Sequence, residues 1–239
     1  MKSLAIGIVF LIAIISFSPN AQAQNTISIN FVSGFDWPVS VGEDHPAGVI
    51  ANTKWNNVNA GEGTSGTSGD LNDHAGAATT ATVSWEGYPR PWPQSPSQTF
   101  DGDFEMFADF LLPTALDSAI TVTLDGIPFP HYDVYVYVSS HFFVEHIPGA
   151  VELDGIRYYY RTLLYTSNNF VQITSTSKDE PTFANYAVFQ GLSGSSQTLG
   201  YELFSPWMNA AGVAGIQIVD ASSVQVESET WGAIKTLYR

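Results

Sequence analysis

Two runs of alternating polar and apolar residues, separated by a short break with one glycine and two prolines, dominate residues 120–140 (ITVTLDGIPFPHYDVYVYVSS). Successive side chains of a β-strand point to opposite faces, so the second run has one apolar face and one mixed face. The apolar face carries Tyr132, Val134, Val136 and Val138. We therefore predict a β-β unit in a half-buried sheet, with the valine-bearing face in the core.

Short segments of the same kind recur along the chain. Residues 26–32 bring Ile27, Ile29 and Phe31 into phase, and residues 77–85 do the same for Ala81, Val83 and Trp85. Further short β-rich runs occupy residues 150–160, 171–177, 185–190, 199–203 and 213–219. Many short strands separated by turn residues favour an all-β sandwich with long loops over a fold of alternating strands and helices.

The segments between these strands have a different character. Residues 36–76 are rich in Gly, Ser, Thr, Asn and Asp, and residues 61–70 (GEGTSGTSGD) contain no side chain that could build a core. We expect residues 61–70 to form a mobile surface loop. Residues 104–112, which Pro113 follows, predict either a short helix or a short bent strand. At most one or two short helices are expected in the whole chain.

The N-terminus has the pattern of a secretory signal peptide. Lys2 precedes the apolar residues 4–15, and an Ala-Gln-Ala cleavage site lies at residues 21–23. The apolar run is shorter than the roughly 20 residues that span a bilayer. We assign residues 1–23 to the signal, 24–220 to one sandwich domain, and 221–239 to a polar linker and short tail. The alternative is a retained N-terminal anchor helix.

Charge and cysteine content limit which classes of binding partner and which cellular locations are expected. The chain has 23 acidic and 8 basic residues, a formal net charge of −15, and no cysteine. Without a Lys/Arg cluster to neutralise phosphates, nucleic acid and anionic membranes are poor partners. Export without disulfides is typical of a bacterial envelope or secreted protein. We therefore expect a secreted or cell-surface location and no membrane span.

Acidic side chains form two candidate calcium sites, although the twelve-residue EF-hand pattern is absent. One consists of Asp101, Asp103 and Glu105, and the other of Asp70, Asn72 and Asp73. A structural calcium would suit an exported chain without disulfides. The alternative is that these residues simply keep an acidic protein soluble. No cofactor is predicted.

Catalytic motifs are sparse. The sequence lacks a nucleophile elbow, a zinc-protease motif, a P-loop and a dinucleotide fingerprint, and it has no thiol. His141, Glu145 and His146 cluster after the central strand, so a metal or hydrolytic site is conceivable there, but they match no zinc-ligand spacing. Their alternative role is that of solvated loop residues.

Aromatic side chains provide the remaining functional signal. A pyranose has an apolar C–H face and a rim of hydroxyls, so sugar sites combine flat rings with hydrogen-bonding groups. Our first candidate sugar-binding site lies before and within the Pro-rich residues 89–96. Our second candidate sugar-binding site precedes it in the sequence. These candidate ligand-binding residues are Trp85, Tyr88, Arg90 and Trp92, and then Trp55 and Asn57. The alternative is that the rings pin long loops onto the sandwich.

Six short blocks, in a fixed order, carry a family resemblance. They are SINF, NTKWNN after Ala47–Gly48, LNDHAG, LDGIPFPHYDVYVYVSS, NYAVFQGLSG and AGVAGIQIV. Together they resemble a poorly characterised domain of secreted and surface proteins of bacteria. The resemblance implies a jelly-roll-type β-sandwich related to galactose-binding-like domains, and no established activity. The C-terminal WGAIKTLYR looks like a sorting segment of such proteins.

These observations together predict a secreted, non-catalytic binding or surface-architecture module, with a glycan or cell-surface polymer as the expected ligand. The glycan rests on analogy between folds. One alternative is an extracellular polysaccharide hydrolase that uses Glu145 with Asp133 or His146 as acid and base. The other is a structural envelope protein that binds another protein.

Overall fold

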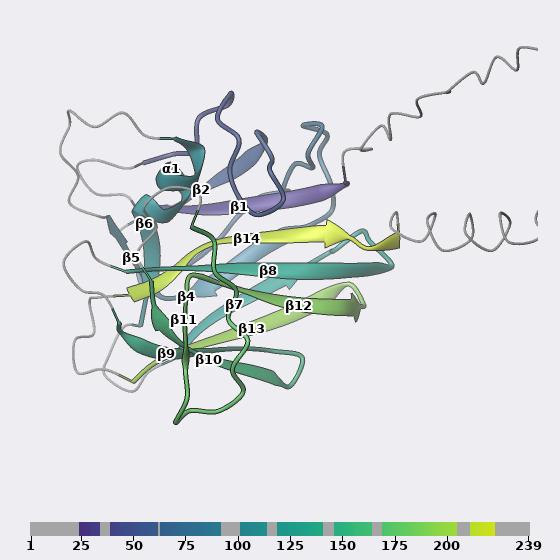
Figure 1. The fold of residues 1–239 in the computed structure, drawn as a ribbon. Coiled ribbons are helices and arrows are strands. Elements are labelled where there is room, and N and C mark those ends of the chain that lie inside the picture. Colours follow the sequence, from purple (N-terminus) through teal and green to yellow (C-terminus); the bar gives the residue numbers. More distant parts are fainter. Residues whose placement is uncertain are drawn as a thin grey trace, which may run out of the picture.

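The computed structural model describes residues 24–33, 39–61, 63–91, 101–113, 119–140, 146–163, 169–204 and 211–222. Two β-sheets stack on each other, and the one helix of the described residues lies near one end of the first sheet (Figure 1). The described part of the chain consists mostly of strands, which confirms the all-β sandwich predicted from the sequence. The predicted signal peptide and the predicted C-terminal tail lie outside the described residues, except for residues 221 and 222.

The first sheet is built around the long strand β8. Its strands follow the order β12 (Tyr186–Ser193), β8 (His131–Ser140), β14 (Ala211–Asp220), β1 (Thr26–Ser33) and β2 (Trp55–Gly61). Beyond the end of β1, β14 pairs with β6 (Asp109–Leu112). Strand β6 pairs on its other side with β5 (Tyr88–Pro91). The pairs are antiparallel except β1 with β2.

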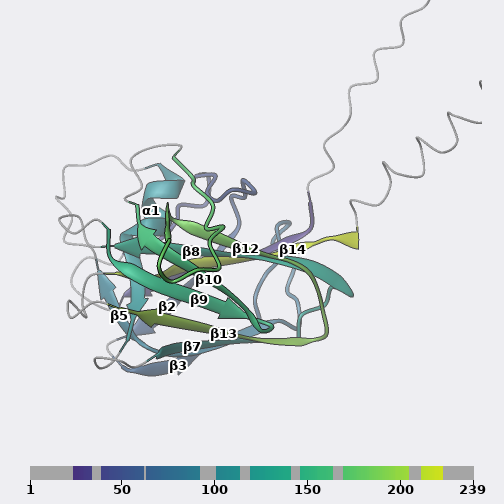
Figure 2. The same ribbon diagram turned by 60° about the horizontal axis from the view of Figure 1, so that its bottom comes forward.

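The second sheet carries the opposite half of the sandwich. Its order is β11 (Thr182–Ala184), β10 (Ile156–Thr162), β9 (Pro148–Leu153), β13 (Ser196–Leu203), β7 (Ala119–Asp125), β4 (Thr82–Glu86) and β3 (Ser65–Thr67). Figure 2 shows β10, β9, β13 and β7 side by side in this order, with β3 beyond β7. Only β10 and β11 pair in parallel.

The main core fills the space between the two sheets. Val134 and Val136 of β8 are fully buried, as the alternation predicts, and so are Ile27 and Ile29 of β1. Each such side chain contributes about 1.5–3 kcal/mol when it leaves water. The in-phase positions of β4 also point inward, which confirms the strand phase read from the sequence.

The sequence predicted that the two central runs form a β-β unit in one half-buried sheet. That prediction is wrong, because the two runs belong to different sheets. β7 pairs with β13 and β4, whereas β8 pairs with β12 and β14. Residues 126–130 therefore cross from one sheet to the other. Gly126 makes this crossing with φ of +67°, and a Cβ there would come 2.1 Å from the carbonyl oxygen of Thr80. Alternation fixes which face is buried but not which strand is the neighbour.

The outer face of β8 is covered as well, which the sequence did not predict. Tyr137 is fully buried in a second apolar cluster with Trp55, Met106 and Phe107. The helix α1 (Gly102–Ala108) lies over this cluster and ends where β6 begins at Asp109. The segment predicted as helix or bent strand is thus one followed by the other. The buried Asp109 carboxylate accepts hydrogen bonds from the backbone N–H groups of residues 33 and 39, at 3.0 and 3.1 Å.

Residues 61–70 are not simply the surface loop that their composition predicts. Strand β3 lies within them and pairs antiparallel with β4 at the edge of the second sheet. Ser68 adds two bonds to Val83, one from its own N–H to the Val83 carbonyl at 2.8 Å and one from the Val83 N–H to its hydroxyl at 3.0 Å. Backbone pairing needs no large side chain, so composition alone missed this strand.

Candidate functional site

Trp85, the first predicted ligand-binding residue, lies in the core. Its side chain is only 4 % exposed and meets the Phe31 ring edge-to-face, with 5.8 Å between ring centroids. The ring also runs beneath Gly66 of β3, where a Cβ would come 2.3 Å from Cζ2. Trp85 therefore offers no exposed ring face to a ligand, and its position fits the alternative role of a packing anchor.

Trp55 and Asn57 also hold structure together. The Trp55 ring is 8 % exposed, and its Nε1–H donates to the Asn52 carbonyl at 2.8 Å. The Asn57 amide accepts from the Val41 N–H at 2.9 Å and donates to the Val41 carbonyl at 3.0 Å. The Asn57 bonds hold Val41 against β2. Trp55 and Asn57 also line a hollow of about 460 Å³, so their binding role stays a prediction.

The remaining predicted residues belong to β5 or follow it. Tyr88 and Arg90 are partly buried in β5, and Tyr88 packs against the second apolar cluster. Trp92 lies outside the described residues. A binding role for these three side chains stays a prediction.

Four of the five acidic side chains considered for calcium accept hydrogen bonds from backbone N–H groups. Asp101 caps α1 by accepting from the Phe104 N–H at 2.7 Å. Asp103 accepts from the Gly48 N–H at 2.7 Å, and Glu105 accepts from the Gly42 N–H at 2.8 Å. In the second group, Asp73 accepts from the N–H groups of residues 75 and 77. Over the described ranges, no three His, Cys, Asp or Glu side chains converge as metal ligands.

The residues considered for hydrolysis do not come together in the described structure. Asp133 lies near the start of β8 and accepts from the Gly191 N–H at 2.8 Å. His146 follows the far end of that strand, and at about 3.3 Å per residue the strand from 133 to 140 spans roughly 23 Å. His141 and Glu145 lie outside the described residues. The pairing of Glu145 with Asp133 or His146 as acid and base therefore stays a prediction.

A different surface gathers polar side chains, namely the outer face of the second sheet. The register of five neighbouring strands places one outward residue of each in a single row across the sheet. This row, called here the outer row, consists of Arg157, Glu152, Gly200, Thr121 and Glu86. The residues on either side of Gly200 and Thr121 in their strands point into the core. Because strand order and register create the outer row, its members are far apart in the sequence.

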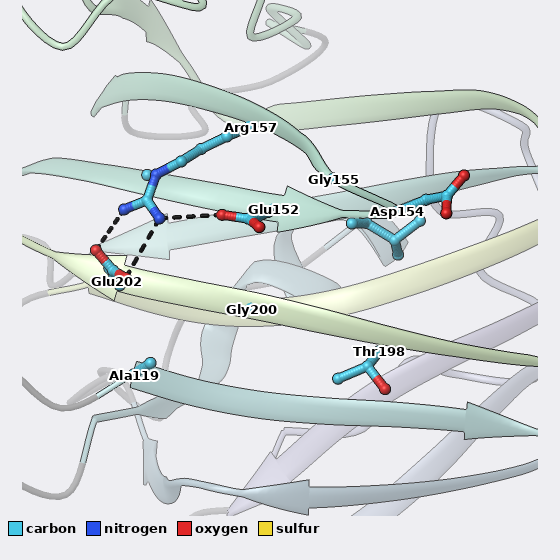
Figure 3. A pocket seen from close by; sticks show the side chains of 10 residues that line it. Ala119, Glu152, Asp154, Gly155, Arg157, Thr198, Gly200 and Glu202 are labelled. Atoms are coloured by element: carbon cyan, nitrogen blue, oxygen red, sulfur yellow. Dashed lines mark hydrogen bonds and ion pairs between the residues drawn. The ribbon is translucent and has the colours of Figure 1, made fainter.

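A hollow of about 290 Å³, called here the first hollow, lies over the middle of this face. Gly200 of β13 forms its floor, Ala119 lies at the start of the neighbouring β7, and the ion-paired Glu152, Arg157 and Glu202 stand together (Figure 3). A Cβ added at Gly200 would approach no heavy atom more closely than 3.9 Å, the distance to Glu152. The glycine therefore leaves open space rather than relieving a clash, and that space is the depression itself.

Arg157 is held between two carboxylates at the edge of the first hollow. Its Nη1 lies 3.0 Å from Glu152 Oε2, and its Nη2 pairs with Glu202 Oε2. The Glu202 hydrogen bond, followed by that of Glu152, raises the pKa of Arg157. The three side chains remain 30 %, 44 % and 41 % exposed for Arg157, Glu152 and Glu202. Because Arg157 also lies over the Tyr159 ring, its orientation is fixed while its polar partners stay accessible to a ligand.

A second hollow, also about 290 Å³, opens on the same face toward the β3 edge. Its lining includes the hydroxyl-bearing Ser84, Thr121 and Thr123, together with Glu86 and the predicted site residue Trp85. Thr121 is the direct neighbour of Gly200 in the outer row. The two hollows are therefore adjacent, and their lining residues come from six neighbouring strands, β10 to β3.

Sequence reasoning missed this surface for an identifiable reason. Glu152 and Arg157 flank a hairpin turn, and Thr198, Gly200 and Glu202 alternate along β13, so each looks like an ordinary solvent-facing position. A usable signal was Gly200, because a glycine inside a strand marks a weak point, a bulge or a close approach. The aromatic criterion favoured large rings instead, and of these Trp55 and Trp85 are buried.

No protein-family model matches this chain, and neither does any curated protein or solved structure. Among the described residues, no helix has the length and apolar content needed to cross a membrane.

Proposed function

We propose that this chain is a secreted, non-catalytic binding module whose ligand is a glycan, held on the outer face of the second sheet. The observation that carries the proposal is the first hollow, floored by Gly200 and bordered by Arg157 between two partly exposed glutamates. Sugar hydroxyls both donate and accept hydrogen bonds. A guanidinium supplies fixed donors, carboxylates supply acceptors, and threonine hydroxyls supply both.

Two features of the sequence support a secreted location for the protein and its assignment as a binding module. Residues 1–23 have the pattern of a secretory signal, and the sequence blocks resemble a domain of secreted and surface bacterial proteins. Glutamates already bridged by an arginine serve better as oriented hydrogen-bond acceptors than as the acid and base of a hydrolase. The proposal is therefore binding without bond cleavage.

A variant that fills the first hollow tests the proposal. Gly200→Val adds a β-branched side chain to open space in a strand, so we expect the fold to be kept. Wild type and variant are compared on a glycan array, and wild-type hits are measured by calorimetry. We expect Gly200→Val to lose at least about tenfold in affinity, since the ligand would have to displace two methyl groups.

The matched control is Thr82→Val, which places the same side chain on β4 outside the residues that line either hollow. It should bind as wild type does. If wild-type protein binds no glycan, or if Gly200→Val binds as tightly as the control, the proposed function is wrong and a structural role in the envelope takes its place.

A further inference from the structure

The two hollows on the outer face of the second sheet lie along one line. Gly200 lines the first hollow, Thr121 lines the second, and the two residues are directly paired between β13 and β7. The line continues in register to Arg157 on one side and to Glu86 on the other. A ligand seated in the first hollow can therefore extend into the second by crossing the strands.

The length of this line exceeds one sugar. Neighbouring strands lie about 4.8 Å apart, so the five strands from β10 to β4 place Arg157 and Glu86 roughly 19 Å apart. In the middle of this line Gly200 has no side chain and Thr121 has a short one, whereas Arg157 and Glu86 at its ends have long ones. The shape favours an extended chain over a single terminal residue.

Charge selects among extended chains. The charged side chains that line the two hollows are Glu86, Glu152, Asp154 and Glu202, against one cation, Arg157. Both glutamates beside Arg157 keep part of their surface exposed. With a net charge of −15 for the whole chain, polyanionic polymers are repelled and a cationic polymer is attracted.

We propose that the ligand of this face is an extended oligosaccharide that carries free amino groups and lies across the strands through both hollows. The inference rests on the proposed function and adds the length and the charge of the ligand. Amino groups would meet Glu86 at one end of the outer row and Glu152, which lies next to Arg157, at the other. Sugar hydroxyls would meet Thr121 of the outer row and also Thr123 and Ser84, which line the second hollow.

Calorimetry with β-1,4-linked glucosamine oligomers tests length and charge separately. The hexamer should bind at least about tenfold more tightly than the dimer, because only the longer chain reaches both hollows. The fully N-acetylated hexamer has the same length without the positive charges and should bind more weakly. Raising the salt concentration should weaken binding of the glucosamine hexamer.

One variant and its control test whether the bound oligosaccharide reaches the far end of the outer row. Glu86→Gln removes a charge from an exposed side chain at the far end, so we expect folding to be unchanged and hexamer affinity to fall about three- to tenfold. The dimer should be affected less than the hexamer. Asp179→Gln, which changes an exposed acid that lines neither hollow, is the control and should leave both affinities unchanged.

The outcomes separate this inference from the proposed function. If another glycan binds in a Gly200-dependent manner while the glucosamine hexamer does not, the inference is overturned and glycan binding stands. Equal affinity for dimer and hexamer, or tighter binding of the acetylated hexamer, also overturns it. If no glycan binds at all, both proposals fail together.

Discussion

Gly66 of β3 lies against the indole of Trp85 on the inner side of the second sheet, at a position where a Cβ would come 2.3 Å from Cζ2. The two residues are direct partners between β3 and β4, so their Cα–Cβ directions share a face. Only a residue without a side chain lets the Trp85 ring reach under the edge strand. The ring thereby closes the end of the core beside Phe31.

Gly66→Ala should therefore destabilise the protein, because its methyl group competes with the Trp85 ring for the same space. We expect a loss of about 1–3 kcal/mol in the free energy of unfolding, measured by chemical denaturation. Gly69→Ala is the control, since no heavy atom lies within 4 Å of its added Cβ. Equal effects of the two substitutions would show that the contact with Trp85 does not matter.

Deletion of residues 63–69 should cost several kcal/mol, contrary to the expectation for a plain surface loop. The deletion removes β3, its pairing with β4 and the cover over Trp85. Loop shortening alone changes the closure entropy by less than about 1 kcal/mol. Denaturation of the deletion variant decides between these magnitudes. An unchanged midpoint would mean that β3 contributes nothing to stability.

Val136→Asp should prevent folding. Val136 is fully buried between β12 and β14, and no Lys or Arg is among the buried side chains of the described residues to pair with a carboxylate. The cost of burying an unpaired charge exceeds the stability of an ordinary domain unless the group becomes neutral. We expect insoluble protein or no cooperative thermal transition. Thr198→Asp on the exposed face of β13 should fold and melt cooperatively, which controls for the added charge.

Attachment of the residues around His45 to α1 should depend on pH. The hydrogen bond that His45 Nδ1–H donates to the Glu105 carboxylate raises the pKa of His45 above its usual 6.5. A raised pKa in the folded state means that the stabilising contribution is complete below pH 6.5 and is lost as the pH rises through the raised value. An NMR titration of His45 should show the elevated pKa, and Glu105→Gln should return it toward 6.5. A wild-type midpoint at or below 6.5 would contradict the ion pair.

The sequence by itself determined where most strands lie and which of their faces is buried. The alternation at Val134 and Val136, and at Ile27 and Ile29, suffices because side chains of a strand point to opposite faces with a period of two. Local signals of this kind depend only on neighbouring residues. They also restricted residues 104–112 to a short helix or a bent strand, and both are present.

Only the tertiary structure decided which strands are neighbours, and the candidate site depends on that choice. Gly200 becomes the floor of a hollow because β13 lies between β9 and β7, which brings Glu152 and Thr121 to its two sides. Trp85 is buried because β3 packs over it, and Trp55 is buried because it packs in one apolar cluster with residues of α1. Each of these elements is distant in the sequence from the tryptophan with which it packs. Pairing between distant segments is set by the summed burial of the whole sandwich, so no local pattern could have revealed it.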